Sequence, residues 1–337
     1  MTSRATATTG APSLPSIAEI LRAKERILPY CCRTPLVRLE IEGLASQLYL
    51  KLEGLQPIGA FKLRAAVNAI VGSDLALSSG VCTASTGNMA QGVAWIARHL
   101  GIPARVIVPR GTDQVKLASA RRMGAEIHLV SPGEWWTIMT THEVEDEWGY
   151  FVHPVANNEV IAGNATIFKE IIEDLPDVDT VIAPFGGGGL LSGLIAGRNA
   201  FKLDTRIIGC ESDAATPLTH AIAANGPVRV TCTPSFVTGM GSPIVLEEMW
   251  PLISSGLNGC IDVSQEAICD AIRVVFERAH VLAEGAGAAP VAAALTGKVT
   301  GRKIVCVISG ANIDAEKFIS ILSGVIPQPA TTANYDD

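Results

Sequence analysis

The sequence predicts an α/β fold with parallel sheets, because strand-like and helix-like segments alternate along the chain. Short apolar runs at 106–108 and 126–130 are each followed by a helix-like stretch, one at 113–123 and a longer one that extends to Tyr150. The alternation resumes beyond this point and continues to the apolar run 305–308. Repeated units of this kind place successive strands parallel to one another, with helices on the sheet faces.

Composition restricts the class of protein. The 337 residues, 48% of them hydrophobic, can bury one large core or two unequal ones. A net charge of −7 and a pI near 5.5, with no basic stripe, argue against a nucleic-acid partner. The longest uncharged run, 180–197, is interrupted by glycines, so we expect no membrane span.

The start of the chain and the cysteines indicate a cellular compartment. Residues 1–10 lack the apolar core of a secretion signal. The eight cysteines contain no C-x-x-C pair and mostly lie in apolar contexts. We therefore expect buried, reduced thiols in a cytoplasmic protein.

A candidate nucleophile lies at Lys62. The segment 47–53 alternates leucines with polar residues, as strands do, and the turn 56–59 ends it. Lys62 then opens the helix-like stretch 63–70. A lysine placed between a strand and a helix can be partly desolvated, which lowers its pKa and leaves a nucleophilic neutral amine. The alternative is an ordinary solvated lysine at a helix start.

Two loops have the composition of anion-binding sites. Residues 85–91 (Ser-Thr-Gly-Asn-Met-Ala-Gln) follow the apolar run 81–84 and precede a helix-like stretch. Such a turn presents free backbone N–H groups to a carboxylate or phosphate. Four consecutive glycines, 186–189, follow the strand-like run 180–185, and they let the backbone fold tightly around a phosphate.

The glycines do not form a dinucleotide-binding fingerprint. The pattern G-x-G-x-x-G fails in both registers, because Leu191 or Ser192 occupies the third glycine position. Glu211 does lie at roughly the distance of a ribose-binding acid. A nicotinamide enzyme would nevertheless leave Lys62 unexplained, so we disfavour that class.

Five motifs together resemble a known family. The Lys62 segment, the 85–91 loop, the glycines 186–189 and the segments 284–288 and 309–312 have the order and spacing found in pyridoxal-phosphate enzymes of the tryptophan-synthase-β type, fold type II. Within that group the chain looks most like the threonine and serine dehydratases and the serine racemases. Three further shared elements are Thr34-Pro35-Leu36, Val152-His153-Pro154 and Val160-Ile161-Ala162-Gly163.

The resemblance implies two unequal domains, each with an open twisted sheet, as in tryptophan synthase β. Residues 1–73 and 153–337 would form the larger, cofactor-binding domain. Residues 74–152 would form a smaller mobile domain that carries the 85–91 loop. A homodimer is usual in the family.

The resemblance also assigns residues to roles. Lys62 would hold pyridoxal 5′-phosphate as a Schiff base and later remove the substrate Cα proton as a general base. Asn88 would contact the phenolic oxygen, and Phe61 would pack near the ring. The implied cofactor-binding residues are Phe61, Lys62, Asn88, Gly186, Gly187, Gly188, Gly189, Gly239, Glu284 and Ser309. The implied substrate-binding residues are Ser85, Thr86, Gly87, Asn88 and Met89.

Ser309 suggests the type of reaction. In the family this position faces the pyridine nitrogen, and a hydroxyl cannot hold that nitrogen protonated as a carboxylate would. The ring is then a weaker electron sink, which favours expulsion of a β-leaving group. The favoured activity is a dehydratase, or ammonia-lyase, that converts a β-hydroxy amino acid such as L-threonine or L-serine to a 2-oxo acid and ammonia.

At three places the sequence departs from the family pattern, and there the family's residue roles do not carry over directly. Met89 replaces the histidine of the usual Ser-x-Gly-Asn-His loop. Asn164-Ala165 stands where Gln-Gly is common, and Pro217 stands where an acid that binds a divalent cation is usual. Glu211 could bind a monovalent ion instead, or it could cap the end of a strand.

The role of Thr86 and the identity of the substrate stay open at this point. In racemases a serine at the Thr86 position protonates the opposite face of the carbanion, so Thr86 is a candidate second-face acid/base. Its other reading is a turn residue that caps the following helix. Met89 and the pair Trp135-Trp136 suggest a bulkier substrate such as phenylserine, although a tryptophan pair more often serves packing. A serine racemase is a further alternative, and a non-catalytic pyridoxal-phosphate-binding protein is the least favoured.

Overall fold

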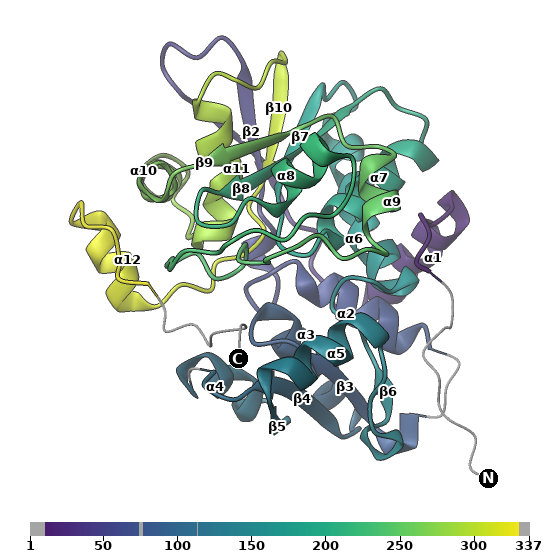
Figure 1. The fold of residues 1–337 in the computed structure, drawn as a ribbon. Helices are drawn as coiled ribbons and strands as arrows, with labels where there is room; N and C mark the ends of the chain where they lie inside the picture. Colours follow the sequence, from purple (N-terminus) through teal and green to yellow (C-terminus); the bar gives the residue numbers. More distant parts are fainter. Residues whose placement is uncertain (1–10, 74–76, 113, 330–337) are drawn as a thin grey trace.

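The computed structural model describes residues 11–73, 77–112 and 114–329. Within them the strands form a six-stranded sheet in the order β1-β2-β10-β7-β8-β9 and a four-stranded sheet in the order β5-β4-β3-β6, which lie one above the other in Figure 1. The strands are β1 (Leu36–Leu39), β2 (Gln47–Lys51), β3 (Val81–Ala84), β4 (Ala104–Pro109), β5 (Glu126–Val130), β6 (Tyr150–Phe151), β7 (Thr180–Pro184), β8 (Arg206–Ser212), β9 (Cys260–Val263) and β10 (Lys303–Val307). The α-helices are α1 (Ile17–Ile27), α2 (Lys62–Val71), α3 (Asn88–Leu100), α4 (Gln114–Arg122), α5 (Pro132–Thr141), α6 (Asn158–Asp174), α7 (Gly189–Ala200), α8 (Pro217–Ala224), α9 (Trp250–Ser254), α10 (Gln265–Ala279), α11 (Gly285–Leu295) and α12 (Ala315–Leu322).

The predicted α/β class is confirmed, with one exception to parallel pairing. The neighbouring strands of the four-stranded sheet, and β2, β10, β7, β8 and β9, pair in parallel. The strand β1 instead runs antiparallel to β2, with Leu36 opposite Lys51. The connection between them, residues 40–46, is too short for the crossover that a parallel pair needs.

The prediction of a long helix that extends to Tyr150 is wrong. Helix α5 ends at Thr141, and His142 adopts a left-handed conformation with φ 61°. A short 3₁₀ turn, Asp146–Trp148, and the strand β6 follow. The segment after His142 contains four acidic residues within five positions, whose repulsion disfavours further helical turns.

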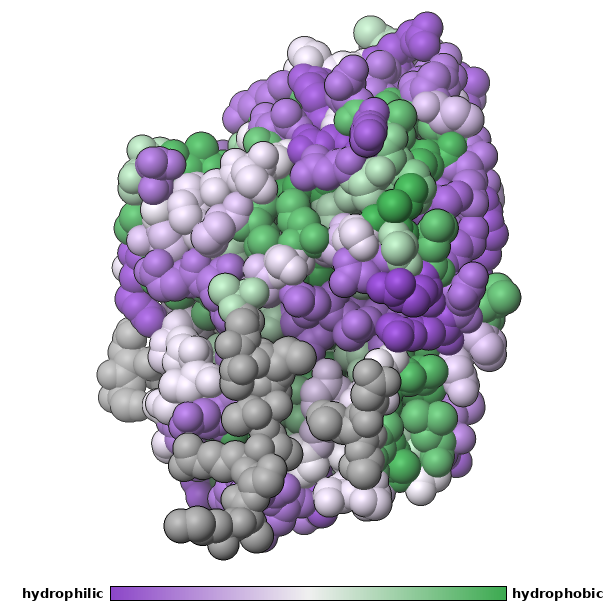
Figure 2. All heavy atoms as spheres, turned by 90° about the vertical axis from the view of Figure 1, so that its right-hand side faces the viewer, coloured by the Kyte–Doolittle hydropathy of each residue, from purple (hydrophilic) through white to green (hydrophobic). Residues whose placement is uncertain are grey.

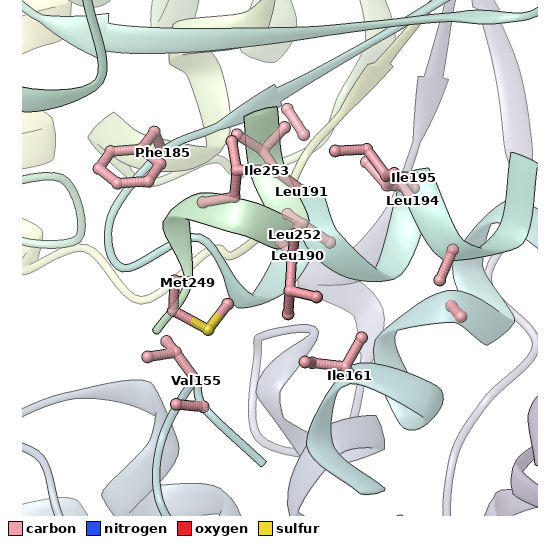
Figure 3. Packing of buried hydrophobic residues seen from close by; sticks show 14 of the residues in the cluster. Val155, Ile161, Phe185, Leu190, Leu191, Leu194, Ile195, Met249, Leu252 and Ile253 are labelled. Atoms are coloured by element: carbon pink, nitrogen blue, oxygen red, sulfur yellow. The ribbon is translucent and has the colours of Figure 1, made fainter. Parts of the chain in front are cut away.

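Three clusters of buried apolar side chains form the core. One packs α10 and α11 on one face of the six-stranded sheet, and another packs α2 and α3 on the four-stranded sheet. The third contains α6 and α7 and continues from the six-stranded sheet to Phe151 of the other sheet. Figure 3 shows its centre, where Leu190 and Leu191 of α7 lie near Ile253. The domain boundaries at 73/74 and 152/153 stay a prediction.

Four buried charges lie where α2 meets the six-stranded sheet. Arg64 donates from Nε to Glu53 Oε2 (2.8 Å) and from Nη1 to Glu170 Oε1 (2.7 Å). Lys51 contacts Glu170 and donates to the Thr34 carbonyl at 2.7 Å. Burial alone raises the pKa of Glu53, but the charges and hydrogen bonds of Arg64, with Lys51 and Thr34, hold it below its ordinary value. The two positive and two negative charges balance, and together they fix the orientation of α2.

The cysteines only partly match the expectation. The structure shows free thiols at all eight positions. Cys82, Cys210, Cys269 and Cys306 are buried, as predicted, whereas Cys32 and Cys232 are exposed, so the prediction is wrong for these two. Both exposed thiols lie in segments without regular secondary structure, where an apolar sequence neighbourhood does not imply burial.

Within the described residues no helix is long and apolar enough to cross a bilayer. On the face drawn in Figure 2, hydrophilic side chains alternate with smaller apolar patches.

We predict that Arg64→Met destabilises the fold by about 3–5 kcal/mol, because Glu53 and Glu170 then lose their shared buried partner. The free energy of unfolding in urea measures this loss. The matched control is Arg38→Met, which removes one side of the exposed Arg38–Glu40 pair and should change stability by at most about 1 kcal/mol. Equal small effects of both substitutions would contradict a structural role for the cluster.

Candidate active site

Lys62 is the first residue of α2, and the chain before it is paired with the segment after β10. The Phe61 N–H donates to the Ser309 carbonyl at 3.0 Å, and Ala60 forms an antiparallel bridge with Gly310. The Ala311 N–H donates to the Gly59 carbonyl at 2.8 Å. Two motifs that lie about 250 positions apart in the sequence are therefore joined by backbone hydrogen bonds.

The Lys62 side chain is partly buried, and its hydrogen-bond acceptor is a carbonyl group. Its Nζ donates to the Pro154 carbonyl at 2.7 Å and lies 5.2 Å from the centroid of the Phe61 ring. Burial lowers the pKa of Lys62 to about 8. A carbonyl does not carry the charge that would restore an ordinary pKa, so a nucleophilic neutral amine is accessible near physiological pH.

The glycines at 186–189 form a cradle lined by backbone at the start of α7. A Cβ atom would lie 2.4 Å from the Gly239 carbonyl oxygen at Gly186, 2.9 Å from Val155 at Gly187 and 2.5 Å from Ile253 at Gly188. Gly188 also has φ 92°, which side chains rarely tolerate. Asn164 supports the cradle from α6 by donating to the Gly189 carbonyl at 3.0 Å. A close-packed glycine turn before a helix N-terminus suits a phosphate group.

Asn88 connects the loop before α3 to the six-stranded sheet. Its Nδ2 donates to Glu284 Oε1 at 2.9 Å, and its Oδ1 accepts from Asn312 Nδ2 at 2.8 Å. Burial raises the pKa of Glu284 to about 7, while the hydrogen bond from Asn88 acts in the opposite direction. Glu284 also lies against Gly310, so Asn88 stands beside the segment that pairs with Phe61.

A cavity of about 950 Å³ opens above these residues. Five predicted site residues line it, namely Thr86, Gly87, Asn88, Gly239 and Glu284. Its opposite wall is the irregular segment 229–241. Lys62, the glycines 186–189 and Ser309 are not part of this lining, but Gly186 lies against Gly239, and Gly310, next to Ser309, lies against Glu284. The arrangement offers a partly buried amine, a glycine turn before a helix N-terminus and an open pocket for a small molecule.

The substrate loop differs from its expected form in two respects. Helix α3 has Gly87 as its N-cap and no side-chain cap, so the reading of Thr86 as a helix cap finds no support. Ser85 Oγ accepts from the Gly87 N–H at 3.3 Å, and Thr86 is free to face the cavity. Met89 is 1% exposed and packs in the core cluster of α2 and α3. Its side chain therefore does not reach a substrate, and only its backbone can serve the predicted role.

Glu211 caps a helix in the structure. Its carboxylate accepts from the N–H groups of Leu218 (2.7 Å) and Thr219 (2.9 Å) at the start of α8. The Thr219 hydroxyl donates to it as well. Both carboxylate oxygens thus have partners, and the monovalent-ion site predicted here gains no support from this geometry.

Sequence reasoning gave no role to two groups that the structure places in the site. Asn312 ends the 309–312 motif, and its contact with Asn88 could have been suspected from that position. The Pro154 carbonyl, which holds Lys62, is a backbone atom that any residue could supply. Trp135 and Trp136, which suggested a bulkier substrate, pack against the core cluster of α6 and α7.

Comparisons with known proteins agree with this geometry. Residues 27–310 match the model of the family described as pyridoxal-phosphate dependent enzyme. The L-threonine ammonia-lyase of Geobacter sulfurreducens is 37% identical over 309 residues, which is 90% of this chain and 77% of that protein. Maize serine racemase has a similar structure, with a TM-score of 0.83 and 30% identity over 92% of this chain and 98% of that one. The processed form of threonine deaminase isoform 2 from Solanum lycopersicum superposes with a TM-score of 0.79 and 28% identity over 96% of this chain and 98% of that one.

The matched region contains every residue that the sequence assigned to the site. The glycine cradle and the partly buried lysine fit the phosphate and the aldehyde of the cofactor that the family shares. The chain belongs to the family of pyridoxal-phosphate-dependent enzymes.

Proposed function

We propose that the chain is a dehydratase, or ammonia-lyase, that converts L-threonine or L-serine to a 2-oxo acid and ammonia. The observation that carries this proposal is the partly buried Lys62 amine, held by the Pro154 carbonyl in the turn that packs against a glycine cradle. The similarity to the L-threonine ammonia-lyase from Geobacter sulfurreducens supports the choice of reaction.

Each part of the site has a chemical task. The glycines 186–189 would hold the cofactor phosphate, Asn88 would bind the ring oxygen, and Ser309 would offer its hydroxyl to the ring nitrogen. Ser85, Thr86 and Gly87 bind the substrate carboxylate through hydroxyl and N–H groups. When bound, the cofactor supplies the electron-withdrawing ring that stabilises the electron pair left on Cα.

Lys62 moves the proton. Its neutral amine takes the Cα proton, and the Pro154 carbonyl keeps the resulting ammonium in place. The Cα electron pair forms the Cα–Cβ double bond as the bond from Cβ to the hydroxyl breaks, and the proton that Lys62 took from Cα balances the departing hydroxide as water. The released enamine takes up one water and yields the 2-oxo acid and ammonia, so the water lost in elimination is regained in hydrolysis.

A serine racemase is the second candidate. Thr86 lines the cavity and does not cap α3, so its hydroxyl is available to protonate the second face of Cα. The similarity to maize serine racemase favours the same reading. The sequence argument for a bulkier substrate such as phenylserine is weakened, because Met89 is buried in the core and the partly buried tryptophan pair packs against it.

We also propose a domain division and an assembly. Residues 1–73 and 153–337 form the large domain and residues 74–152 the small mobile one, a division supported by the separate four-stranded sheet. We propose a cytoplasmic homodimer, which the free thiols and the exposed Ile319 of α12, at 61% exposure, support.

The first prediction concerns the attachment of the cofactor. The purified protein should be yellow, and borohydride should fix the cofactor to the peptide that contains Lys62. Lys62→Ala should lose the reducible linkage and at least about 10²-fold of ammonia release, because the general base is gone. The control, Lys24→Ala, removes a surface partner of Glu173. It should leave the reducible linkage and the rate of ammonia release unchanged. A reducible covalent cofactor in Lys62→Ala would contradict the assignment of Lys62 as the residue that holds the cofactor.

The second prediction follows from the lowered pKa of Lys62. The neutral amine is the reacting form, so the rate at which the apoprotein captures the cofactor should rise with pH and level off above about 8. An ordinary lysine, with a pKa near 10.4, keeps gaining neutral amine well beyond that point. Stopped-flow absorbance measures the rate, with N-acetyl-lysine as the control. A profile for the protein that parallels this control would contradict a perturbed amine.

The third prediction separates the two candidate reactions. If the protein is a dehydratase, Thr86→Ala removes one hydroxyl near the carboxylate and should mainly raise KM, by about 2–10-fold, with ammonia release retained. Thr86→Ser keeps the hydroxyl and serves as the matched control. Chiral chromatography of L-serine reactions gives the other half of the test. Loss of D-serine formation in Thr86→Ala alone, with D-serine the main product of the unmodified protein, would favour the racemase.

A further inference from the structure

The turn between β6 and α6, residues 153–156, touches two separate parts of the proposed site. The Pro154 carbonyl accepts the hydrogen bond from Lys62 Nζ. Val155 packs against the glycine cradle, where a Cβ on Gly187 would lie 2.9 Å from Val155 Cγ1 and one on Gly189 would lie 3.2 Å from Val155 Cα. Figure 3 shows Val155 beside Met249 in the same apolar cluster. The position of this single turn therefore sets both the lysine and the cradle.

The imidazole of His153 closes the turn. Its Nδ1 accepts from the N–H of Ala156 at 2.6 Å and from that of Val155 at 3.3 Å. Because Nδ1 accepts, the ring proton is on Nε2, which donates to the Met139 carbonyl at 3.1 Å. One ring nitrogen thus fixes the turn and the other fixes the ring to α5.

The same surroundings keep His153 neutral. The side chain is 2% exposed, and burial lowers its pKa well below the ordinary value. The nearby His142 and Lys62 lower the pKa further, while the hydrogen bond to Met139 opposes them. A protonated ring would lose the lone pair that accepts from Ala156, so the closed turn requires the neutral form.

His142 and Glu248 restrict the position of the His153 ring. The His142 ring stacks on that of His153, with centroids 4.3 Å apart and planes at 16°. Its Nε2 lies 2.7 Å from Glu248 Oε1. These three residues could be read as a metal site. Stacked rings present their faces to each other, however, and both nitrogens of His153 already have partners, so the geometry fits a fixed ring better than a liganded ion.

We propose that His153 is a positioning residue for Lys62. By closing the 153–156 turn, it holds the Pro154 carbonyl against the lysine amine and Val155 against the phosphate cradle. This inference rests on the proposed roles of Lys62 and the glycines 186–189.

Three substitutions separate the two hydrogen-bonding functions of the ring. His153→Asn keeps an acceptor near the position of Nδ1 and loses the donor to Met139. His153→Gln places its amide further from the backbone, so it can keep the donor to Met139 but loses the acceptor for the turn. His153→Phe keeps a ring for stacking and loses both. The measurement is the rate at which each apoprotein captures pyridoxal phosphate at Lys62, trapped with borohydride and quantified by peptide mass spectrometry.

The capture rate should follow the acceptor. At a temperature where all variants are folded, His153→Asn should lie within about threefold of the unmodified protein, and His153→Gln and His153→Phe should be at least about tenfold slower, as expected when a reacting group is misplaced. In turnover, kcat should fall in these two with KM nearly unchanged, because the 85–91 loop is untouched. Equal capture rates for His153→Asn and His153→Gln would overturn the proposal. Capture rates that merely follow the stability of the variants, measured as the midpoint of urea unfolding, would overturn it as well.

A measurement on the unmodified protein does not depend on the folding of variants. The ¹⁵N shifts of His153 should show a proton on Nε2 and none on Nδ1 near pH 7. A proton on Nδ1 would overturn the proposal. If instead the proposed role of Lys62 is wrong, the trapped cofactor will appear at another residue in the unmodified protein itself. This result is distinct from a failure of the His153 proposal.

Discussion

The buried ion cluster around Arg64 fixes the start of α2, and the placement of the candidate nucleophile depends on it. Arg64 lies two residues after Lys62 on the same helix and bonds to Glu53 and Glu170, which precede and follow α2 in the sequence. A buried charge cluster does not tolerate partial separation, so the helix cannot slide or rotate without a large energetic cost. Lys62 itself stands outside this cluster with a carbonyl as its acceptor, which explains how one helix turn holds both a strongly paired cation and a lysine with a lowered pKa.

The two sheets meet around the cavity through side chains from both. Asn88, the first residue of α3, bonds to Glu284 and Asn312 beside the six-stranded sheet. At the far side, His142 reaches Glu248, and the guanidinium of Arg229 lies 5.3 Å from the ring centroid of Trp136. A movement of the four-stranded sheet would change these contacts and leave the strand pairing of both sheets intact. This attachment is compatible with the proposed mobile small domain, whose 85–91 loop would close over a bound amino acid.

The sequence predicted the fold class correctly, and with it the positions of several strands and turns, because these depend on local patterns. The roles of the site residues stay predictions. The strand Glu126–Val130 has the predicted bounds, and the glycines 186–189 follow their strand as expected. The errors concern features set by tertiary contacts or by backbone atoms. The direction of β1, the burial of Met89 and the acceptor role of the Pro154 carbonyl have no signature in residue type. Helix α5 ends at Thr141, before an acidic run whose repulsion disfavours further helical turns.

The central claim is that the assembled site removes the Cα proton from one face with Lys62 and expels the β-hydroxyl. Its most direct test is a complete product balance for the purified holoprotein with L-threonine and with L-serine, in which 2-oxo acid, ammonia and both enantiomers of the remaining amino acid are followed in one reaction. The account predicts that 2-oxo acid and ammonia form in equal amounts, match the amino acid consumed and leave the residual substrate in the L form. Consumption of the L-enantiomer with D-enantiomer as the main product and little ammonia would contradict it.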